Sequence, residues 1–300
     1  MSVEAKEAEL LIPTPRRGRR GGKAGVMQPG WVGYTFLVVV LIVAAYPLYW
    51  TFMIASGDAT TVTRRPFLTL PGPNFLENAL RVIDSPTLPV SFWTATLNSI
   101  IVSGVVAISV VFFSTLAGYA FSKLRFKGKN GLLYFVIATL AVPTQLAVVP
   151  LYIVMVNLQL TGNLLAVILP AVVSAFGVFW MTQYMRQALP YELIEAARVD
   201  GASMFRTFWS IALPSARPAA AMLALFIFIQ TWTNFFWPFI VLDNKSATLP
   251  VALATLSNNY FDDYSLIFAG VIISIVPLFL LFLVTGRQLV KGIMEGAVKG

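Results

Sequence analysis

The sequence predicts an all-α integral membrane protein with six transmembrane helices. Two observations carry this prediction: 58% of the 300 residues are hydrophobic, and only 11% are charged. A soluble domain has about 25% charged residues, which its water-exposed surface requires. So few charges cannot cover a surface in water, and we expect most of this surface to face lipid.

Stretches without charge mark the individual spans, because a charged side chain at the centre of a membrane helix costs about 2.5 to 3.5 kcal/mol. They predict helices over residues 31–54, 91–121, 131–156 and 164–185, one helix between Arg217 and Asp243, and one between Asp263 and Arg287. The third and fourth helices share one uncharged window. As a single helix this window would reach about 80 Å across a hydrocarbon core of about 30 Å. We therefore place a turn at residues 157–163, which include Gly162.

Basic residues predict the orientation of the chain. Six spans put both termini on one side, and that side receives most of the Lys and Arg residues outside the spans. They are Arg16, Arg17, Arg19, Arg20, Lys23, Lys123, Arg125, Lys127, Lys129, Arg186, Arg198, Arg206, Arg217, Arg287, Lys291 and Lys299. By the positive-inside rule this side is cytoplasmic. We expect a multi-pass protein of the cell membrane with both termini in the cytoplasm.

The chain divides into a basic tail, residues 1–30, which we expect to be disordered, and a transmembrane domain, residues 31–300. A secretory signal is the alternative for the Arg-rich tail and the apolar stretch after it. That stretch exceeds the 7–15 residues or so of a signal's apolar region, and no small-residue cleavage site follows. We therefore favour an uncleaved first helix.

Several kinds of chemistry are excluded by what the sequence lacks. The chain has no Cys and no His, so nucleophile–histidine pairs and most metal sites are excluded. It has no G-x-x-x-x-G-K-[ST] loop for a nucleotide, and the predicted spans carry no ionisable Asp, Glu, Lys or Arg for ion coupling. We expect no catalytic residue, metal or cofactor in this chain, a neutral solute, and an energy source in another polypeptide.

The segment 187–217 is the longest internal segment on the predicted cytoplasmic side. Pro190 suits the first position of a helix, Glu192 suits the positive end of its dipole, and Gly201 suits the left-handed position after its last turn. These residues predict a short helix, and Ala196 and Ala197 would let another surface approach it closely. Two interpretations stay open: a helix lying on the membrane, or a helix that docks a cytoplasmic motor.

After this helix we expect a second short helical piece over residues 204–212. Pro214 and Pro218 then predict a break before the fifth span.

Glu195-Ala196-Ala197, Gly201 after a three-residue gap, and Ile211-x-Leu213-Pro214 resemble the EAA motif of ABC importer permeases. The motif lies, as in that family, between the fourth and fifth of six helices. The resemblance implies the type I ABC importer permease fold, with a core over about residues 91–287, and a coupling helix that sits in a cleft of an ATPase subunit. The coupling residues that it implies are Glu195, Ala196, Ala197, Arg198, Asp200 and Gly201.

Residues 231–238 and 296–300 resemble segments of the carbohydrate branch of this family, which includes the smaller permease subunit of the maltose importer. The resemblance implies import of a sugar and three kinds of partner. These are a second homologous permease, two ATPase subunits that bind ATP and Mg, and an extracytoplasmic sugar-binding protein. The composition adds membrane lipid, and we expect no nucleic acid, because the basic residues lie in short runs between apolar segments. Two other functions stay open: an importer of a polyol phosphate or a peptide, and an ATP-independent channel or scaffold. The sequence does not name the solute.

Aromatic faces and amide groups bind sugars, and they suggest a substrate path within the spans. The candidates are Trp232, Asn234, Trp237, Asn98 and Gln145. For each residue taken singly, helix packing or anchoring at the membrane interface is the more ordinary explanation. Asp262 and Asp263, in the external segment before the sixth span, are candidates for contact with the binding protein, with a solvated loop as the alternative.

Overall fold

The computed structural model describes residues 30–60, 70–86, 88, 90–259 and 263–297. The tail over residues 1–29 and the candidate Asp262 lie outside these ranges. The chain forms two units, residues 1–49 and 50–300, and each is considered separately.

The described part of the first unit is most of helix α2 (Trp31–Ala55). This helix has 25 residues and no acidic or basic side chain. At 1.5 Å per residue its length is about 37 Å, enough to cross a hydrocarbon core of about 30 Å. The predicted first span is therefore confirmed, and Pro47 lies inside it without ending the helix.

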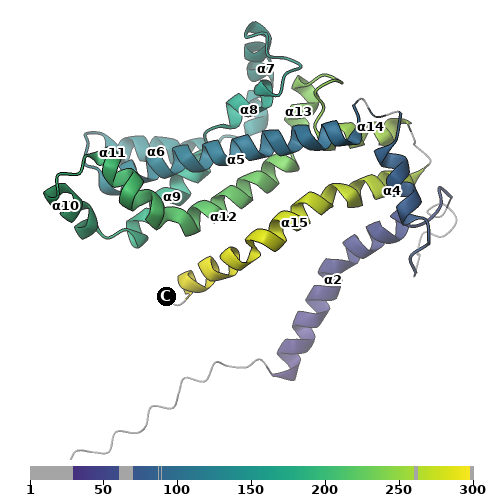
Figure 1. Ribbon diagram of the computed structural model, residues 1–300, viewed down its shortest axis with the longest axis horizontal. Coiled ribbons are helices and arrows are strands. Elements are labelled where there is room, and N and C mark those ends of the chain that lie inside the picture. Colours follow the sequence, from purple (N-terminus) through teal and green to yellow (C-terminus); the bar gives the residue numbers. More distant parts are fainter. Residues whose placement is uncertain (1–29, 61–69, 87, 89, 260–262, 298–300) are drawn as a thin grey trace, which may run out of the picture. The chain divides into compact units, whose positions relative to one another are not determined.

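The second unit is helical throughout its described residues (Figure 1). In chain order its elements are α4 (Phe75–Ile83), α5 (Phe92–Lys123), α6 (Lys129–Thr139), η2 (Thr144–Ala147), α7 (Val148–Asn157), α8 (Leu165–Ala171), α9 (Ala175–Ala188), α10 (Tyr191–Val199), α11 (Met204–Thr207), η3 (Phe208–Ala212), α12 (Leu213–Trp232), α13 (Phe236–Val241), α14 (Leu249–Asn259) and α15 (Tyr264–Ala297).

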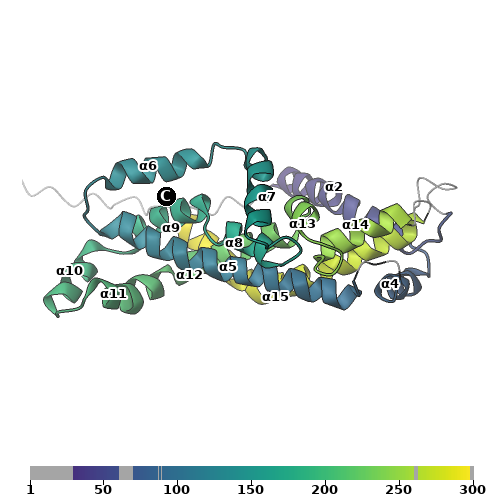
Figure 2. The ribbon, with the colours of Figure 1, turned by 90° about the horizontal axis from the view of Figure 1, so that it is seen from above.

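Helix α5 is the axis of this unit. It begins at the N-cap Ser91, whose Oγ accepts a hydrogen bond from Thr94 N at 3.2 Å. Figures 1 and 2 show α10 and α11 at its carboxyl end and α4 and α14 at its amino end. At the amino end, Asn98 Nδ2 donates to Ala247 O at 3.0 Å, and Leu249 N donates to Ser99 Oγ at 2.8 Å. The two ends of α5 therefore define the two ends of the unit.

Close packing of α5 against α9 depends on small residues. A Cβ atom added at Gly118 of α5 would lie 2.8 Å from the Cβ of Met181 in α9, which is too close for any side chain. Gly177 of α9 meets Ser114 of α5 in the same way. Lipid gives helices no hydrophobic reason to associate, so close van der Waals contact between small residues holds them together.

Five helices are long and apolar enough to cross a membrane, and a sixth span results if one bent pair counts as one. The bent pair is residues 129–139 and 144–157, which meet at 88°. The structure thus agrees with the six predicted spans and refines the third, expected as one helix over 131–156. Pro143 stands at this bend, where it removes a helical hydrogen bond. The predicted turn is confirmed, with Gly162 at a φ of 77°.

The expected break before the fifth span is wrong, because one helix runs from Met204 to Trp232. In a regular helix the ring of Pro214 would clash with the carbonyl of Ser210, four residues earlier. That carbonyl lies in η3, a π-helical turn, which has a wider backbone. The local widening explains how the helix contains Pro214. Pro218 also lies inside the helix.

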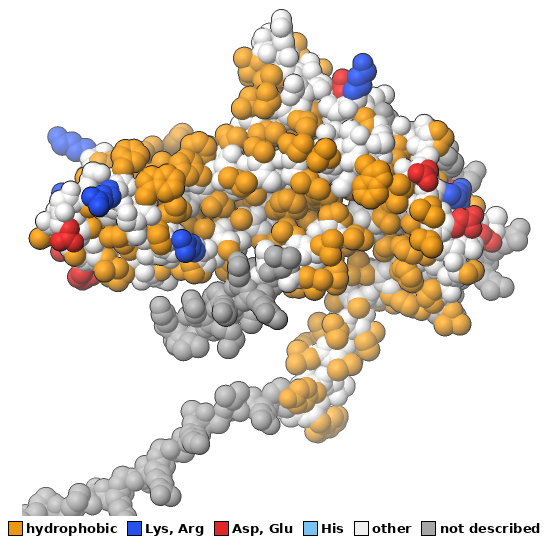
Figure 3. Space-filling model, viewed as in Figure 1, with side chains coloured by type: hydrophobic (Ala, Val, Ile, Leu, Met, Phe, Trp, Pro, Cys, Tyr) orange, Lys and Arg blue, Asp and Glu red, His pale blue; other side chains and the backbone are white. Residues whose placement is uncertain are grey.

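Charged side chains gather at the two ends of the second unit, and apolar side chains cover the surface between them (Figure 3). This distribution is what a spanning domain requires, since ionisable groups at the bilayer centre are costly.

We predict that Gly118→Ala lowers the thermal unfolding temperature of the detergent-solubilised protein. The added methyl group overpacks the α5–α9 contact, at a typical cost of about 1–3 kcal/mol. Gly104→Ala is the matched control, because it is the same change in the same helix and its Cβ meets nothing within 4 Å. It should leave stability unchanged or raise it, as Ala exceeds Gly in helix propensity. Equal effects of the two substitutions would contradict the packing.

Candidate functional site

The short helix α10 ends in a well-defined C-terminal cap. Gly201 has a φ of 74°, so the predicted left-handed turn is confirmed. Ala202 N donates to Ala197 O at 2.9 Å, and Gly201 N donates to Arg198 O at 3.1 Å. These two bonds are the Schellman pattern, which satisfies the last carbonyls of a helix. With Asp200 as its C-cap, α10 is a rigid nine-residue rod.

Helix α10 has an inner and an outer face. Ile194 and Ala197 are buried against the core, whereas Glu195, Ala196 and Arg198 are exposed. The expectation that both alanines of the motif offer a flat outer face is therefore corrected: only Ala196 does so. Ala197 faces inward, where a larger side chain would separate α10 from the body of the protein. Glu195 makes no hydrogen bond or ion pair with another described residue, so its carboxylate is free to meet a partner.

The sequence prediction missed apolar side chains around Gly201. Val199 is 87% exposed and Phe205 is 72% exposed, and Leu193 and Met204 are also exposed. Together these four side chains form an apolar tip on the α10–α11 hairpin. The signal was present in the sequence, because the predicted cytoplasmic loop contains more large apolar residues than a nine-residue helix needs for its buried face. Such a tip is typical of a protein–protein contact.

A second site lies within the spans, as a cavity of about 860 Å³. Three breaks in the helices meet there: residues 140–143 between α6 and η2, residues 172–174 between α8 and α9, and residues 233–235 between α12 and α13. Irregular backbone at membrane depth is tolerated only where it is buried in protein or lines a cavity. Convergent breaks of this kind also mark the solute sites of many transporters.

Three of the five substrate-path candidates line this cavity: Gln145, Asn234 and Trp237. The prediction missed Gln230, Thr231 and Phe226, which line it as well. The first two stand in the last turn of α12, four and three residues before Asn234, which lies in the break after that helix. Their closeness to Asn234 in the sequence was the available signal. The indole of Trp237 donates to Ala166 O at 3.0 Å, so this residue offers its ring face alone.

The other two candidates lie elsewhere, which corrects the expectation for them. Trp232 is 3% exposed and stacks on Phe228 with ring centroids 5.8 Å apart. Asn98 bonds the backbone of Ala247 at the outer end of α5. Both residues pack the protein, and neither is among the residues that line the cavity.

The lining of the cavity contains no Asp, Glu, Lys or Arg. It offers amides and hydroxyls of the residues at the breaks, together with aromatic rings. The side-chain amides of Gln145, Gln230 and Asn234 make no hydrogen bond to another described residue. Uncompensated amides beside aromatic faces suit a solute that is neutral and polyhydroxylated.

Asp263, a candidate for contact with a partner, is held within the chain. Its side chain is 12% exposed and forms an ion pair with Arg81 at 2.9 Å. Ser265 Oγ and Leu266 N donate to its Oδ1 at 2.6 and 3.1 Å, so it caps helix α15. Burial opposes the ionisation of Asp263, but the hydrogen bonds and Arg81 outweigh it and hold its pKa below the usual value.

Comparison with known proteins agrees with this architecture. Residues 111–290 match the family model described as "Binding-protein-dependent transport system inner membrane component". The arabinooligosaccharides transport system permease protein AraQ of Halalkalibacterium halodurans is 35% identical over 273 residues, covering 90% of this chain and 95% of that protein. The lactose transport system permease protein LacG of Rhizobium radiobacter is 30% identical, covering 90% and 97%.

Two further comparisons widen the range of solutes and agree on the fold. The sn-glycerol-3-phosphate transport system permease protein UgpE of Brucella abortus is 29% identical, covering 88% of this chain and 95% of that protein. The crystal structure of a bacterial ABC transporter involved in the import of the acidic polysaccharide alginate has a chain with a TM-score of 0.71 at 24% identity, covering 85% of this chain and 94% of that chain.

The six-span architecture and the central cavity define a membrane transport component rather than an enzyme. The chain belongs to the family of binding-protein-dependent transport system inner membrane components, the permeases of ABC importers. The resemblance read from the EAA-type residues is confirmed at the level of the family.

We predict that Asp263→Ala destabilises the folded protein by about 1 kcal/mol or somewhat more, because it removes the cap of α15 as well as the ion pair. Asp263→Asn is the matched control, since Asn keeps the capping oxygen and loses only the charge. Thermal unfolding in detergent measures both variants. An Asn variant as unstable as the Ala variant would contradict the capping role.

The same carboxylate predicts a pH dependence. Because its pKa is lower in the folded state, its ionised form contributes stability above the unfolded pKa of about 3.9, and this contribution is lost as the pH falls through the folded pKa. Unfolding temperatures measured from pH 5 downwards should therefore fall more steeply for the wild type than for Asp263→Asn. Parallel curves of unfolding temperature against pH would show that Asp263 does not cause the pH dependence.

Proposed function

We propose that this chain is a permease subunit of an ATP-driven, binding-protein-dependent sugar importer and forms half of the translocation path. The observation that carries the proposal is the continuous helix from Met204 to Trp232. It begins at the apolar tip beside α10 and ends at the break that places Asn234 in the cavity. A force applied at the tip therefore reaches the solute site along one rigid element.

The force must come from another polypeptide, because this chain has no nucleotide-binding loop. We propose that α10 and the apolar tip dock an ATPase subunit, with Glu195 as the polar contact and Ala196 as the point of close approach. Arg198, Asp200 and Gly201 then fix the end of the helix. Closure of two ATPase subunits on ATP and Mg would switch the permease between its inward- and outward-facing states.

The remaining partners follow from the same architecture. The cavity lies among the broken helices of a single subunit, and we propose that a second, homologous permease supplies the facing half. An extracytoplasmic sugar-binding protein delivers the solute at the α4–α14 end. The opposite end, with Lys123, Arg125 and Arg186, faces the cytoplasm of the cell that bears this inner-membrane protein.

A neutral sugar is the solute that the cavity supports best. The names of the relatives AraQ and LacG point to oligosaccharides. The name of UgpE points to a phosphorylated polyol, which is the second candidate. A phosphate is bound most strongly by Arg or Lys, and neither residue lines this cavity. A panel of both solute classes, tested for stimulation of ATPase activity by the loaded binding protein, decides between them.

We predict that Glu195→Arg abolishes co-purification of the ATPase and lowers uptake at least about tenfold, because it reverses the charge at the proposed contact. The fold should survive, since Glu195 is exposed. The matched control for ATPase co-purification is Glu77→Arg, the same change at an exposed position in the first turn of α4, at the end of the unit opposite α10. Retention of both ATPase binding and uptake by Glu195→Arg would sink the coupling assignment.

We predict that Asn234→Leu lowers uptake by about tenfold while ATPase binding stays intact, because an unpaired solute hydroxyl costs about 1–3 kcal/mol. Asn157→Leu, at an exposed position outside the cavity, is the matched control. Uptake of radiolabelled sugar by proteoliposomes measures both variants. Equal uptake by Asn234→Leu and the wild type would remove this residue from the path.

A further inference from the structure

A second, smaller cavity lies between the carboxyl end of α5 and the coupling helix. Its volume is about 280 Å³. Its lining residues come from α5, the loop after it, α10 and α11, and they are Tyr119, Lys123, Leu124, Arg125, Tyr191, Ile194, Glu195, Arg198, Met204 and Thr207. The transport cycle proposed above uses Glu195 and Arg198 of this lining, and it gives Lys123 no role.

Lys123 is the unusual member of this lining. The residue is 7% exposed and forms no hydrogen bond or ion pair with any other described residue. The carboxylate of Glu192 is near enough to act on it electrostatically, but it makes no ion pair within 4.0 Å. Its Nζ is not one of the fully buried side-chain atoms, so the ammonium group is open to the cavity that Lys123 lines. A cation that faces a cavity and has no protein partner indicates a site that an anion can complete.

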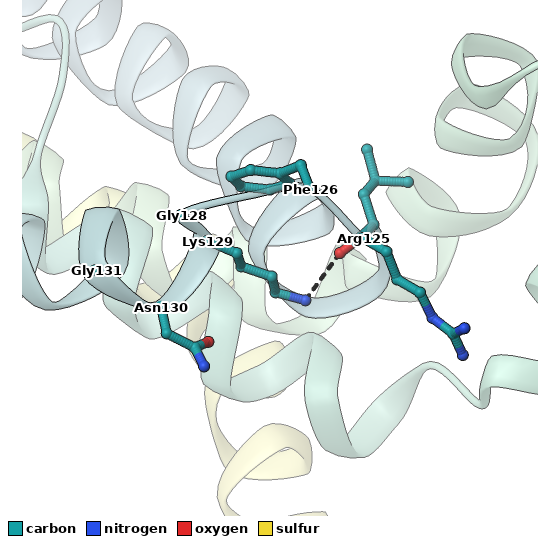
Figure 4. Close-up of a pocket in the computed structure, with 7 residues that line it drawn as sticks. Arg125, Phe126, Gly128, Lys129, Asn130 and Gly131 are labelled. Atoms are coloured by element: carbon teal, nitrogen blue, oxygen red, sulfur yellow. Dashed lines mark hydrogen bonds between the residues drawn. The ribbon is translucent and has the colours of Figure 1, made fainter.

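The other charges of the cavity have the same sign. Arg125 and Arg198 join Lys123, against the single carboxylate of Glu195. The guanidinium of Arg125 is held over the ring of Tyr191 at 5.6 Å, which fixes it beside α10. Figure 4 shows Arg125 pointing away from Lys129, whose Nζ turns back to Leu124 O at 2.9 Å. Lys129 is thus occupied by the loop, while Arg125 remains available to a ligand.

The depth of the cavity relative to the membrane indicates which anion it binds. Thr139 and Val110 line the central cavity, which we place near the middle of the membrane. At 1.5 Å per residue, Lys129 lies about 15 Å from that level along α6, and Lys123 lies about 20 Å from it along α5. Half of the hydrocarbon core is about 15 Å thick. The cationic cavity is therefore at the depth of lipid headgroups.

One exposed aromatic side chain adjoins the cavity. Phe126 directly follows Arg125 in the chain and is 42% exposed, so its ring can meet an acyl chain.

We infer that the cavity between α5 and α10 binds the headgroup phosphate of an anionic phospholipid through Lys123, Arg125 and Arg198. Basic pockets between helices on the cytoplasmic side are suited to such headgroups. The binding itself does not depend on the proposed transport function, which enters only through the position of α10. A lipid held there would brace the coupling helix against α5.

The binding test uses the full-length chain without any ATPase, so that its failure is separate from failure of the proposed function. Native mass spectrometry would count lipids retained by the protein from phosphatidylglycerol and from phosphatidylcholine, and inorganic phosphate would be added as a competitor. We expect preferential retention of phosphatidylglycerol. Equal retention of both lipids would overturn the inference, and displacement by millimolar phosphate would assign the site to free phosphate instead.

Variants test the residues. Lys123→Gln should weaken phosphatidylglycerol binding about tenfold or more, because it removes a charge-assisted hydrogen bond. Lys123→Arg should restore it. Lys127→Gln is the matched control, as Lys127 is an exposed neighbour outside the cavity. If Lys123→Gln fails to fold, the double variant R125Q/R198Q is tested in its place, because both arginines are exposed. Unchanged binding in the folded variants would overturn the site.

A partner carboxylate is the competing occupant. The lipid inference fails if the wild type retains phosphatidylglycerol and phosphatidylcholine equally while Lys123→Gln weakens co-purification of the ATPase. The cavity then belongs to the ATPase contact.

Discussion

The demand that backbone N–H and C=O groups find partners inside a membrane governs this structure. Lipid offers no hydrogen bonds, so the spans must be helices. Any break in a helix must be buried in protein or line a cavity. The second unit has three interruptions, at residues 140–143, 172–174 and 233–235, and residues from all three line one cavity. The proposed solute site therefore lies where irregular backbone lines a cavity. On the face that Figure 3 shows, most charged side chains lie toward the two ends of the unit.

The second constraint is mechanical. Helix α10 ends in two backbone hydrogen bonds at Gly201. The N-cap of the next helix is Ser203, two residues later, whose Oγ accepts from Arg206 N at 3.3 Å. From there the helix continues through the π turn to Trp232. Continuous helix therefore connects the apolar tip with the cavity, and it is first interrupted at residues 233–235. Small residues hold α5 and α9 in close contact.

Much of this could be predicted from the sequence. Uncharged windows located the spans, and Gly201 located the end of α10, because both depend on local chemistry. What failed depends on tertiary context. Pro214 predicted a break, and a π turn removed the clash. The motif alanines looked equivalent, and only packing could turn Ala197 inward. Trp232 and Asn234 are two residues apart and therefore point in different directions, one into the core and one into the cavity. The apolar tip was readable and was overlooked.

The continuous helix from Met204 to Trp232 connects two sites, so thermodynamic linkage applies to their binding affinities. If the state of its cytoplasmic end alters the affinity of the cavity for its solute, occupancy of the cavity alters the affinity for the cytoplasmic partner by the same factor. A loaded permease and an empty one then present different surfaces to the cell interior. The same helix would then transmit the state of the cavity to the cytoplasmic end, in the direction opposite to the proposed coupling.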